Sequence, residues 1–178
     1  MIPLSIPVRS VLLAIAVLSL GACKQEVSPP APAHAALTIE DHATRPAPDD
    51  AERVVLPVEL DSGQTVEVVY AVLRGAPDGD APMAGPEDAI TIRFAAGLDR
   101  GPAGIEIYDS TDLRQRDFSF SLGDSGVIRG LREAIPGMRV GELRRIEIPW
   151  RLAYGENGRG EIPPSTDLVF VVELVSID

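Results

Sequence analysis

Two short sequences place a polar group beside an aromatic ring, and they are the first candidates for a functional site. They are Tyr108-Asp109 and Tyr154-Gly155. The C-terminal part of the chain otherwise lacks a paired nucleophile and base. Its segment 123–126 is glycine-rich but lacks the following Lys-Ser/Thr of a phosphate-binding loop, and therefore indicates a turn. Hydrolysis and phosphoryl transfer are accordingly disfavoured.

A series of motifs between residues 118 and 173 is the most informative feature of the chain. In order they read FSFSLG (118–123), GVIRG (126–130), GMRVGE (137–142), IPWRLAYG (148–155) and IPPS (162–165), followed by LVFVVE (168–173). In this order and spacing the series resembles the FKBP-type peptidyl-prolyl cis/trans isomerases. The resemblance extends back through Tyr108-Asp109-Ser110 to about residue 66. Each motif alone is weak evidence, but together and in register they favour this family.

The resemblance implies a reaction that breaks no covalent bond. Rotation about a peptide bond meets a barrier of about 18–20 kcal/mol because amide resonance separates charge between oxygen and nitrogen. An apolar pocket favours the twisted, less polar transition state, and each ~1.36 kcal/mol of this preference raises the rate about tenfold. The expected site is therefore an apolar pocket of prolyl size with a few oriented polar groups at its rim.

The site residues are carried over from the resemblance, one position at a time. At the rim the Asp109 carboxylate would lie beside two donors to substrate carbonyls, the Tyr154 hydroxyl and the Ile128 backbone N–H. For each apolar member taken alone, core packing is the competing interpretation. The residues assigned to catalysis are Tyr108, Asp109, Phe118, Val127, Ile128, Tyr154 and Phe170, and those assigned to substrate binding are Phe94, Leu131 and Ile162.

Three departures from the family pattern affect this pocket. Leu131 stands where a tryptophan commonly forms the floor, so the pocket should be deeper or looser. Phe94 stands where a tyrosine is common, so a hydroxyl that would help to orient Asp109 is missing. The loop 156–161, with Arg159 near its middle, is about one residue shorter than in some members. These departures bear on catalytic efficiency and macrolide affinity more than on the fold.

The hydrophobic pattern predicts one domain with several strands and little helix. Segments 54–60 and 66–73 are rich in β-branched residues and are separated by a turn sequence, as in a hairpin. Apolar residues alternate along 90–94, 118–122 and 168–174. A short helix should begin at Val127 or Ile128 and end at Pro136-Gly137. These elements predict the α+β class, and the resemblance implies an FKBP-like fold: a bent antiparallel β-sheet wrapped around one short α-helix.

The N-terminal part of the chain predicts export and lipidation. Residues 1–22 resemble a lipoprotein signal peptide, because an apolar run too short to span a bilayer precedes small residues and Cys23. Cys23 is the predicted lipidation site, with an ordinary signal peptide as the alternative. Segment 23–50 is Pro/Ala-rich and predicts an extended tether, which leaves 51–178 as the isomerase domain. His34 and His42 lack partners at ligand spacing, so we expect no metal site there.

These observations predict a lipid-anchored peptidyl-prolyl isomerase that faces the periplasm of a bacterial cell envelope, with the outer membrane slightly favoured because Lys24 follows the cysteine. Its partners would be X-Pro segments of folding envelope proteins, and macrolides are possible inhibitors. No cofactor is expected. The formal charge of −11 disfavours nucleic-acid binding, and the absence of a long helical N-terminal segment predicts a monomer. The alternative is a chaperone or binding module that captures prolyl or apolar segments without catalysis.

Overall fold

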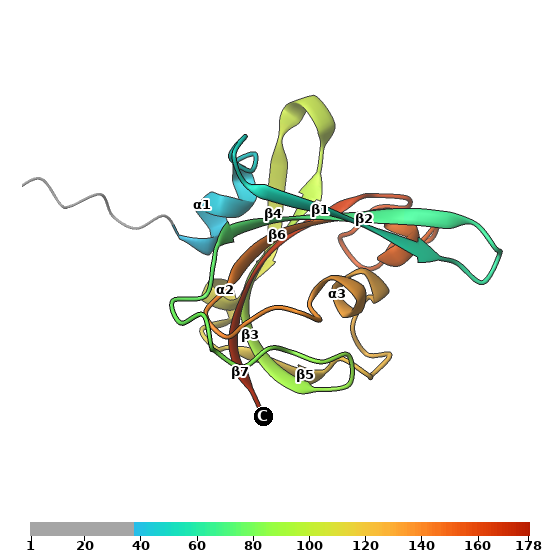
Figure 1. Cartoon of the computed structure of the whole chain (residues 1–178). Helices are drawn as coiled ribbons and strands as arrows, with labels where there is room; N and C mark the ends of the chain where they lie inside the picture. Colours follow the sequence, from blue (N-terminus) through green and yellow to red (C-terminus); the bar gives the residue numbers. More distant parts are fainter. Residues whose placement is uncertain (1–37) are drawn as a thin grey trace, which may run out of the picture. The chain divides into compact units, whose positions relative to one another are not determined.

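The computed structural model describes residues 38–178, which form an antiparallel sheet with short helices (Figure 1). The strand order is β1-β2-β6-β7-β3-β4, and β5 pairs with β3 outside this path. The FKBP-like α+β fold class is thus confirmed. The strands are β1 (Glu52–Glu59), β2 (Thr65–Arg74), β3 (Ala89–Asp99), β4 (Ile105–Ser110), β5 (Phe118–Ser121), β6 (Leu143–Ile148) and β7 (Leu168–Ile177). The helices are α1 (Ile39–Thr44), α2 (Thr111–Arg114) and α3 (Arg129–Ala134), with 3-10 turns η1 (Gly101–Ala103) and η2 (Trp150–Leu152).

The predicted N-terminal hairpin is confirmed as β1 and β2. The two strands pair antiparallel from Glu59–Thr65 to Glu52–Val72. The Leu60 N–H donates to the Gln64 carbonyl at 2.8 Å, which closes the turn. The hairpin extends the sheet through the pairing of β2 with β6.

Alternation along the strands divides the sheet into two faces. Phe170 and Val172 of β7 belong to the main core, whereas Val171 between them belongs to a small second cluster on the opposite face. Helix α3 lies within the curve of the sheet, on the main-core side (Figure 1). It approaches β6 closely because residue 130 is glycine: a Cβ there would lie 2.3 Å from Ile148 Cγ2.

Helix α3 matches the predicted helix in place and extent. Ile128 is its N-cap, and Pro136 follows its C-cap residue, Ile135. The buried Arg144 guanidinium of β6 donates to the Ala134 carbonyl at 2.7 Å and pairs with the buried Glu142 carboxylate at 2.5 Å. Arg144 therefore satisfies a carbonyl at the end of the helix that would otherwise lack a partner.

Helix α1 departs from the prediction, because it lies inside the segment expected to be an extended tether. A capping box between Thr38 and Asp41 begins the helix, and its Ala43 is fully buried against β3, β4 and β7. The Ser110 hydroxyl of β4 donates to the Glu40 carboxylate at 2.6 Å. The folded part therefore begins by residue 38 rather than at 51, and the described chain has α1 and α2 besides the one helix predicted.

The signal peptide, Cys23 and most of the tether fall within residues 1–37, outside the described part of the chain. None of the helices in residues 38–178 is long and apolar enough to span a membrane.

Candidate active site

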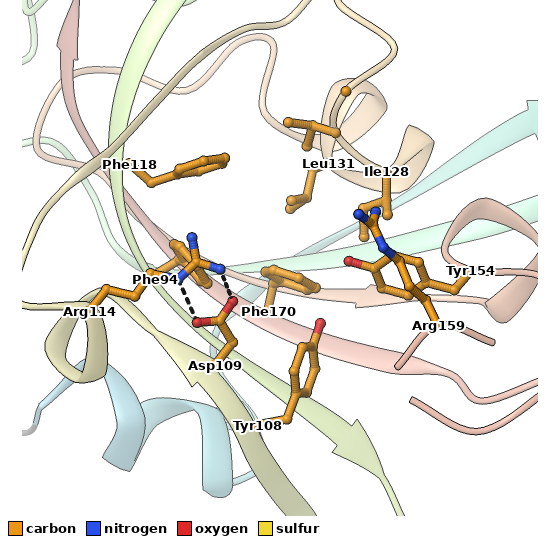
Figure 2. A pocket seen from close by; sticks show the side chains of 12 residues that line it. Phe94, Tyr108, Asp109, Arg114, Phe118, Ile128, Leu131, Tyr154, Arg159 and Phe170 are labelled. Atoms are coloured by element: carbon orange, nitrogen blue, oxygen red, sulfur yellow. Dashed lines mark hydrogen bonds and ion pairs between the residues drawn. The ribbon is translucent and has the colours of Figure 1, made fainter. Parts of the chain in front are cut away.

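Three aromatic side chains from three neighbouring strands converge on the concave face of the sheet. Phe94 of β3 lies with its ring centroid 5.9 Å from that of Phe118 of β5 and 6.0 Å from that of Phe170 of β7. Strand pairing sets this arrangement, because β3 pairs with both β5 and β7. Leu131 of α3 is 3% exposed and completes the apolar lining. Together they line the cavity drawn in Figure 2, whose volume is about 110 Å³.

The cavity suits a small apolar ring. An apolar cavity of roughly 150 Å³ in a protein core admits benzene, and a prolyl ring is of similar size. Part of the opening lies between α3 and the loop that carries Tyr154. The cavity can therefore enclose a prolyl ring while the chain on either side stays outside.

Asp109 is held at the rim by an arginine that the sequence analysis did not select. The Arg114 Nε donates to Asp109 Oδ1 at 2.7 Å, and its Nη2 donates to Asp109 Oδ2 (Figure 2). The guanidinium also lies 5.4 Å from the Phe94 ring centroid and 5.6 Å from that of Phe118. Because Phe94 has no hydroxyl to offer, the arginine is the group that orients this carboxylate.

The short helix α2 brings Arg114 back to Asp109. The Ser110 hydroxyl accepts from the Leu113 N–H at 3.0 Å and begins the helix. Gln115 ends it in the left-handed conformation, with φ of 54°. A single helical turn thus brings together two residues that lie five positions apart in the sequence.

The tyrosines supply hydroxyl groups at the opening of the cavity. Burial raises the pKa of Tyr108, and the nearby Tyr154 and Asp109 raise it further. The Tyr108 hydroxyl therefore keeps its proton at neutral pH and can act as a donor. Tyr154 lies across the opening from Phe118, and its hydroxyl points toward the interior (Figure 2).

The start of α3 presents a backbone donor beside the tyrosine. Ile128 has extended backbone dihedrals (φ −57°, ψ 143°), and its carbonyl accepts the first helical hydrogen bonds. Its own N–H has no backbone acceptor among the described residues. N–H groups at a helix start are left without intrahelical partners, so this one is available to a bound carbonyl.

The structure brings nine of the ten predicted site residues to this cavity, and the tenth lies close by. Ile162 lines an adjoining hollow formed with the loop 159–161. Sequence analysis missed Arg114 as a site residue and did not assign Arg159 to the site, although both line the cavity. Within residues 38–178 no cluster of His, Cys, Asp or Glu could hold a metal ion. The groups present can enclose, desolvate and orient an amide.

Comparisons with known proteins agree with this geometry. Residues 81–175 match the family model described as FKBP-type peptidyl-prolyl cis-trans isomerase. The chain is 36% identical over 118 residues to peptidyl-prolyl cis-trans isomerase FPR2 of Saccharomyces cerevisiae, covering 65% of this chain and 85% of that protein. It is 37% identical over 116 residues to FK506-binding protein 1 of Kluyveromyces lactis, covering 65% and 98%. The matched region contains all ten predicted site residues, and the chain belongs to the FKBP-type peptidyl-prolyl cis-trans isomerase family.

Proposed function

We propose that this isomerase acts on exposed X-Pro bonds of proteins that fold in a bacterial cell envelope, to which it is anchored by lipid at Cys23. The observation that carries the catalytic part is the aromatic cavity of about 110 Å³ with polar groups at its rim. Uncatalysed X-Pro isomerisation takes tens to hundreds of seconds and can limit folding. An envelope protein held in an unfinished fold is therefore a suitable substrate.

The proposed mechanism uses the cavity to exclude water from the amide. Seated against Phe94, Phe118 and Phe170, the prolyl ring leaves bulk water, which stabilises the planar amide more than the twisted one. The transition state is therefore favoured. The Tyr154 hydroxyl and the Ile128 N–H donate to substrate carbonyls and hold the chain on either side. No bond is broken, so no nucleophile or metal is required.

The ion pair of Asp109 and Arg114 forms one wall of the proposed site. The paired carboxylate presents a fixed negative edge toward the twisting amide, while the guanidinium covers the aromatic rings. Electrostatic groups that are already oriented act on a transition state without reorganisation. The same apolar cavity supports macrolide binding, and the relatives named FK506-binding protein favour this proposal.

The envelope location rests on the sequence alone. An apolar segment, small residues and Cys23 follow one another as in a lipoprotein signal, and two or three acyl chains would anchor the protein stably. The outer membrane is the favoured location. Replacing Cys23 with alanine should abolish lipid labelling and release the protein from the membrane fraction. Unchanged labelling and retention would exclude this anchor.

A refolding experiment separates the isomerase from the alternative, a chaperone that uses the same cavity. The chaperone alternative is supported by Leu131 and Phe94, which line the cavity where the family commonly has tryptophan and tyrosine. A protein whose slow refolding phase is limited by proline is refolded with and without residues 36–178. We expect the slow phase to become faster at substoichiometric concentrations. Reduced aggregation with an unchanged slow phase would instead identify a chaperone.

Sedimentation of the same fragment should show a monomer.

A further inference from the structure

Arg159 is a cation at the mouth of the cavity. It lines both the cavity and the adjoining hollow, where Tyr154 also takes part. Its guanidinium carbon lies 5.8 Å from the Tyr154 ring centroid, and Figure 2 shows the side chain beside that ring. A substrate chain leaving the cavity on this side must pass the guanidinium.

The loop holds Arg159 in a defined place. The Arg159 N–H donates to the Ile162 carbonyl at 3.0 Å, and the Ile162 N–H donates back to the Arg159 carbonyl at 3.0 Å. Gly158 has φ of +65°, and a Cβ there would lie 2.2 Å from the Ile162 carbonyl oxygen. The turn therefore admits few other shapes, and a contact that is already positioned costs less ordering on binding.

The positive charge of Arg159 is open to a ligand. The other cation of the cavity, Arg114, is already paired with Asp109. Among the described residues, no carboxylate lies within ion-pair distance of Arg159, although Glu161 lines the same hollow and Glu156 belongs to the same loop. The charged side chains lining the cavity are therefore one carboxylate and two guanidinium groups, in a chain whose formal charge is −11.

We propose that Arg159 is a specificity-determining residue that binds an acidic side chain next to the substrate proline. The proposal rests on the proposed isomerase function. The overall negative charge repels acidic segments at a distance, but this repulsion is screened beyond about 10 Å at 0.1 M salt. At contact distance the attraction between the Arg159 guanidinium and an acidic side chain outweighs this screened repulsion. The favoured substrates are thus prolyl segments with Asp or Glu beside the proline.

The test uses tetrapeptides with Glu, Gln, Leu or Lys before the proline, and a second set with these residues after it. Both affinity, from peptide titration, and kcat/KM, from exchange NMR, are measured at about 0.1 M salt. Wild type should prefer Glu over Gln by about threefold, the size expected for a solvent-exposed ion pair. Arg159→Gln should bring this ratio close to one.

Arg151→Gln is the matched control. Arg151 is also an exposed arginine stacked on an aromatic ring, 4.1 Å from the Trp150 centroid, but it does not line the cavity. Arg151→Gln makes the same change in net charge as Arg159→Gln. This control should keep the wild-type preference for Glu peptides over Gln peptides.

The outcomes separate this inference from the isomerase function. If the protein catalyses isomerisation without preferring Glu, the inference about Arg159 is overturned. The same holds if Arg159→Gln leaves a Glu preference intact. Both outcomes leave the isomerase function standing. A Glu preference in affinity alone, with no faster isomerisation, supports the role of Arg159 and contradicts the catalytic function. Absence of both binding and isomerisation with every peptide contradicts both.

Discussion

Replacing Arg114 with methionine tests whether the orientation of Asp109 contributes to catalysis. The change removes two hydrogen bonds to the carboxylate and the charge above the rings of Phe94 and Phe118, but keeps a long apolar side chain. Asp109 then loses the group that fixes its position at the rim. Both kcat/KM and the free energy of unfolding should therefore fall, and the two are measured separately.

The magnitude follows from the partial exposure of the pair. The side chains of Arg114 and Asp109 are 38% and 24% exposed, so solvent weakens their attraction, and pairs at the surface contribute about 0.2–1 kcal/mol. Each contact of the guanidinium with an aromatic ring adds about 0.5–1 kcal/mol at an exposed site. We expect Arg114→Met to lower the free energy of unfolding by about 1–3 kcal/mol. A loss of about 1 kcal/mol of transition-state stabilisation would lower kcat/KM roughly fivefold.

The assay combines urea unfolding with kcat/KM for Arg114→Met, Asp109→Asn and the double variant. If the two residues act as a unit, the effects on kcat/KM should be less than additive. Arg114→Lys keeps the charge but not the two-pronged geometry, and should recover only part of the activity. Wild-type kcat/KM in Arg114→Met, with lowered stability, would show that the pair serves the fold alone and would refute the reasoning.

Three further predictions concern the pocket floor and helix α1. Leu131→Trp should raise kcat/KM a few-fold to about tenfold, because the larger side chain would fill the space beneath the bound prolyl ring. A lower urea midpoint, from about 1–3 kcal/mol of overpacking, without a gain in rate would contradict this. Ala43→Leu should cost about 1–3 kcal/mol in urea unfolding, because this fully buried position has no room; unchanged stability would mean that α1 is not docked. Burial lowers the folded-state pKa of His42 below 6.5, so its contribution to stability is present above pH 6.5 and lost as the pH falls. Stability at pH 5.5 relative to pH 7.5 should therefore fall more in wild type than in His42→Gln, and equal losses would contradict the assignment.

The cavity lining could be predicted because its members belong to the motifs that carry the family resemblance, and local patterns placed several of them on expected elements. Phe118 and Phe170 lie in alternating strands, and Leu131 lies in a short helix bounded by proline and glycine. Such patterns are set by neighbours in the chain. The register of β3 with β5 and β7 brings Phe94, Phe118 and Phe170 together.

Helix α1 and the role of Arg114 could not be predicted in the same way. Arg114 reaches Asp109 only because α2 makes a single turn, and four residues are too few to show a helical period. Helix α1 buries Ala43, whose small side chain makes little hydrophobic signal in a segment rich in proline and alanine. The available signal was Thr38 followed three residues later by Asp41, which forms the capping box.

The most direct test of the central claim is the cis–trans exchange rate of an X-Pro tetrapeptide in the presence of residues 36–178. The free peptide exchanges between cis and trans with a time constant of tens to hundreds of seconds. If the aromatic cavity lowers the rotation barrier, this time constant should become far shorter. Phe118→Ala, which removes one wall of the cavity, should slow exchange again. Saturable binding of the peptide with an unchanged exchange rate would contradict the claim.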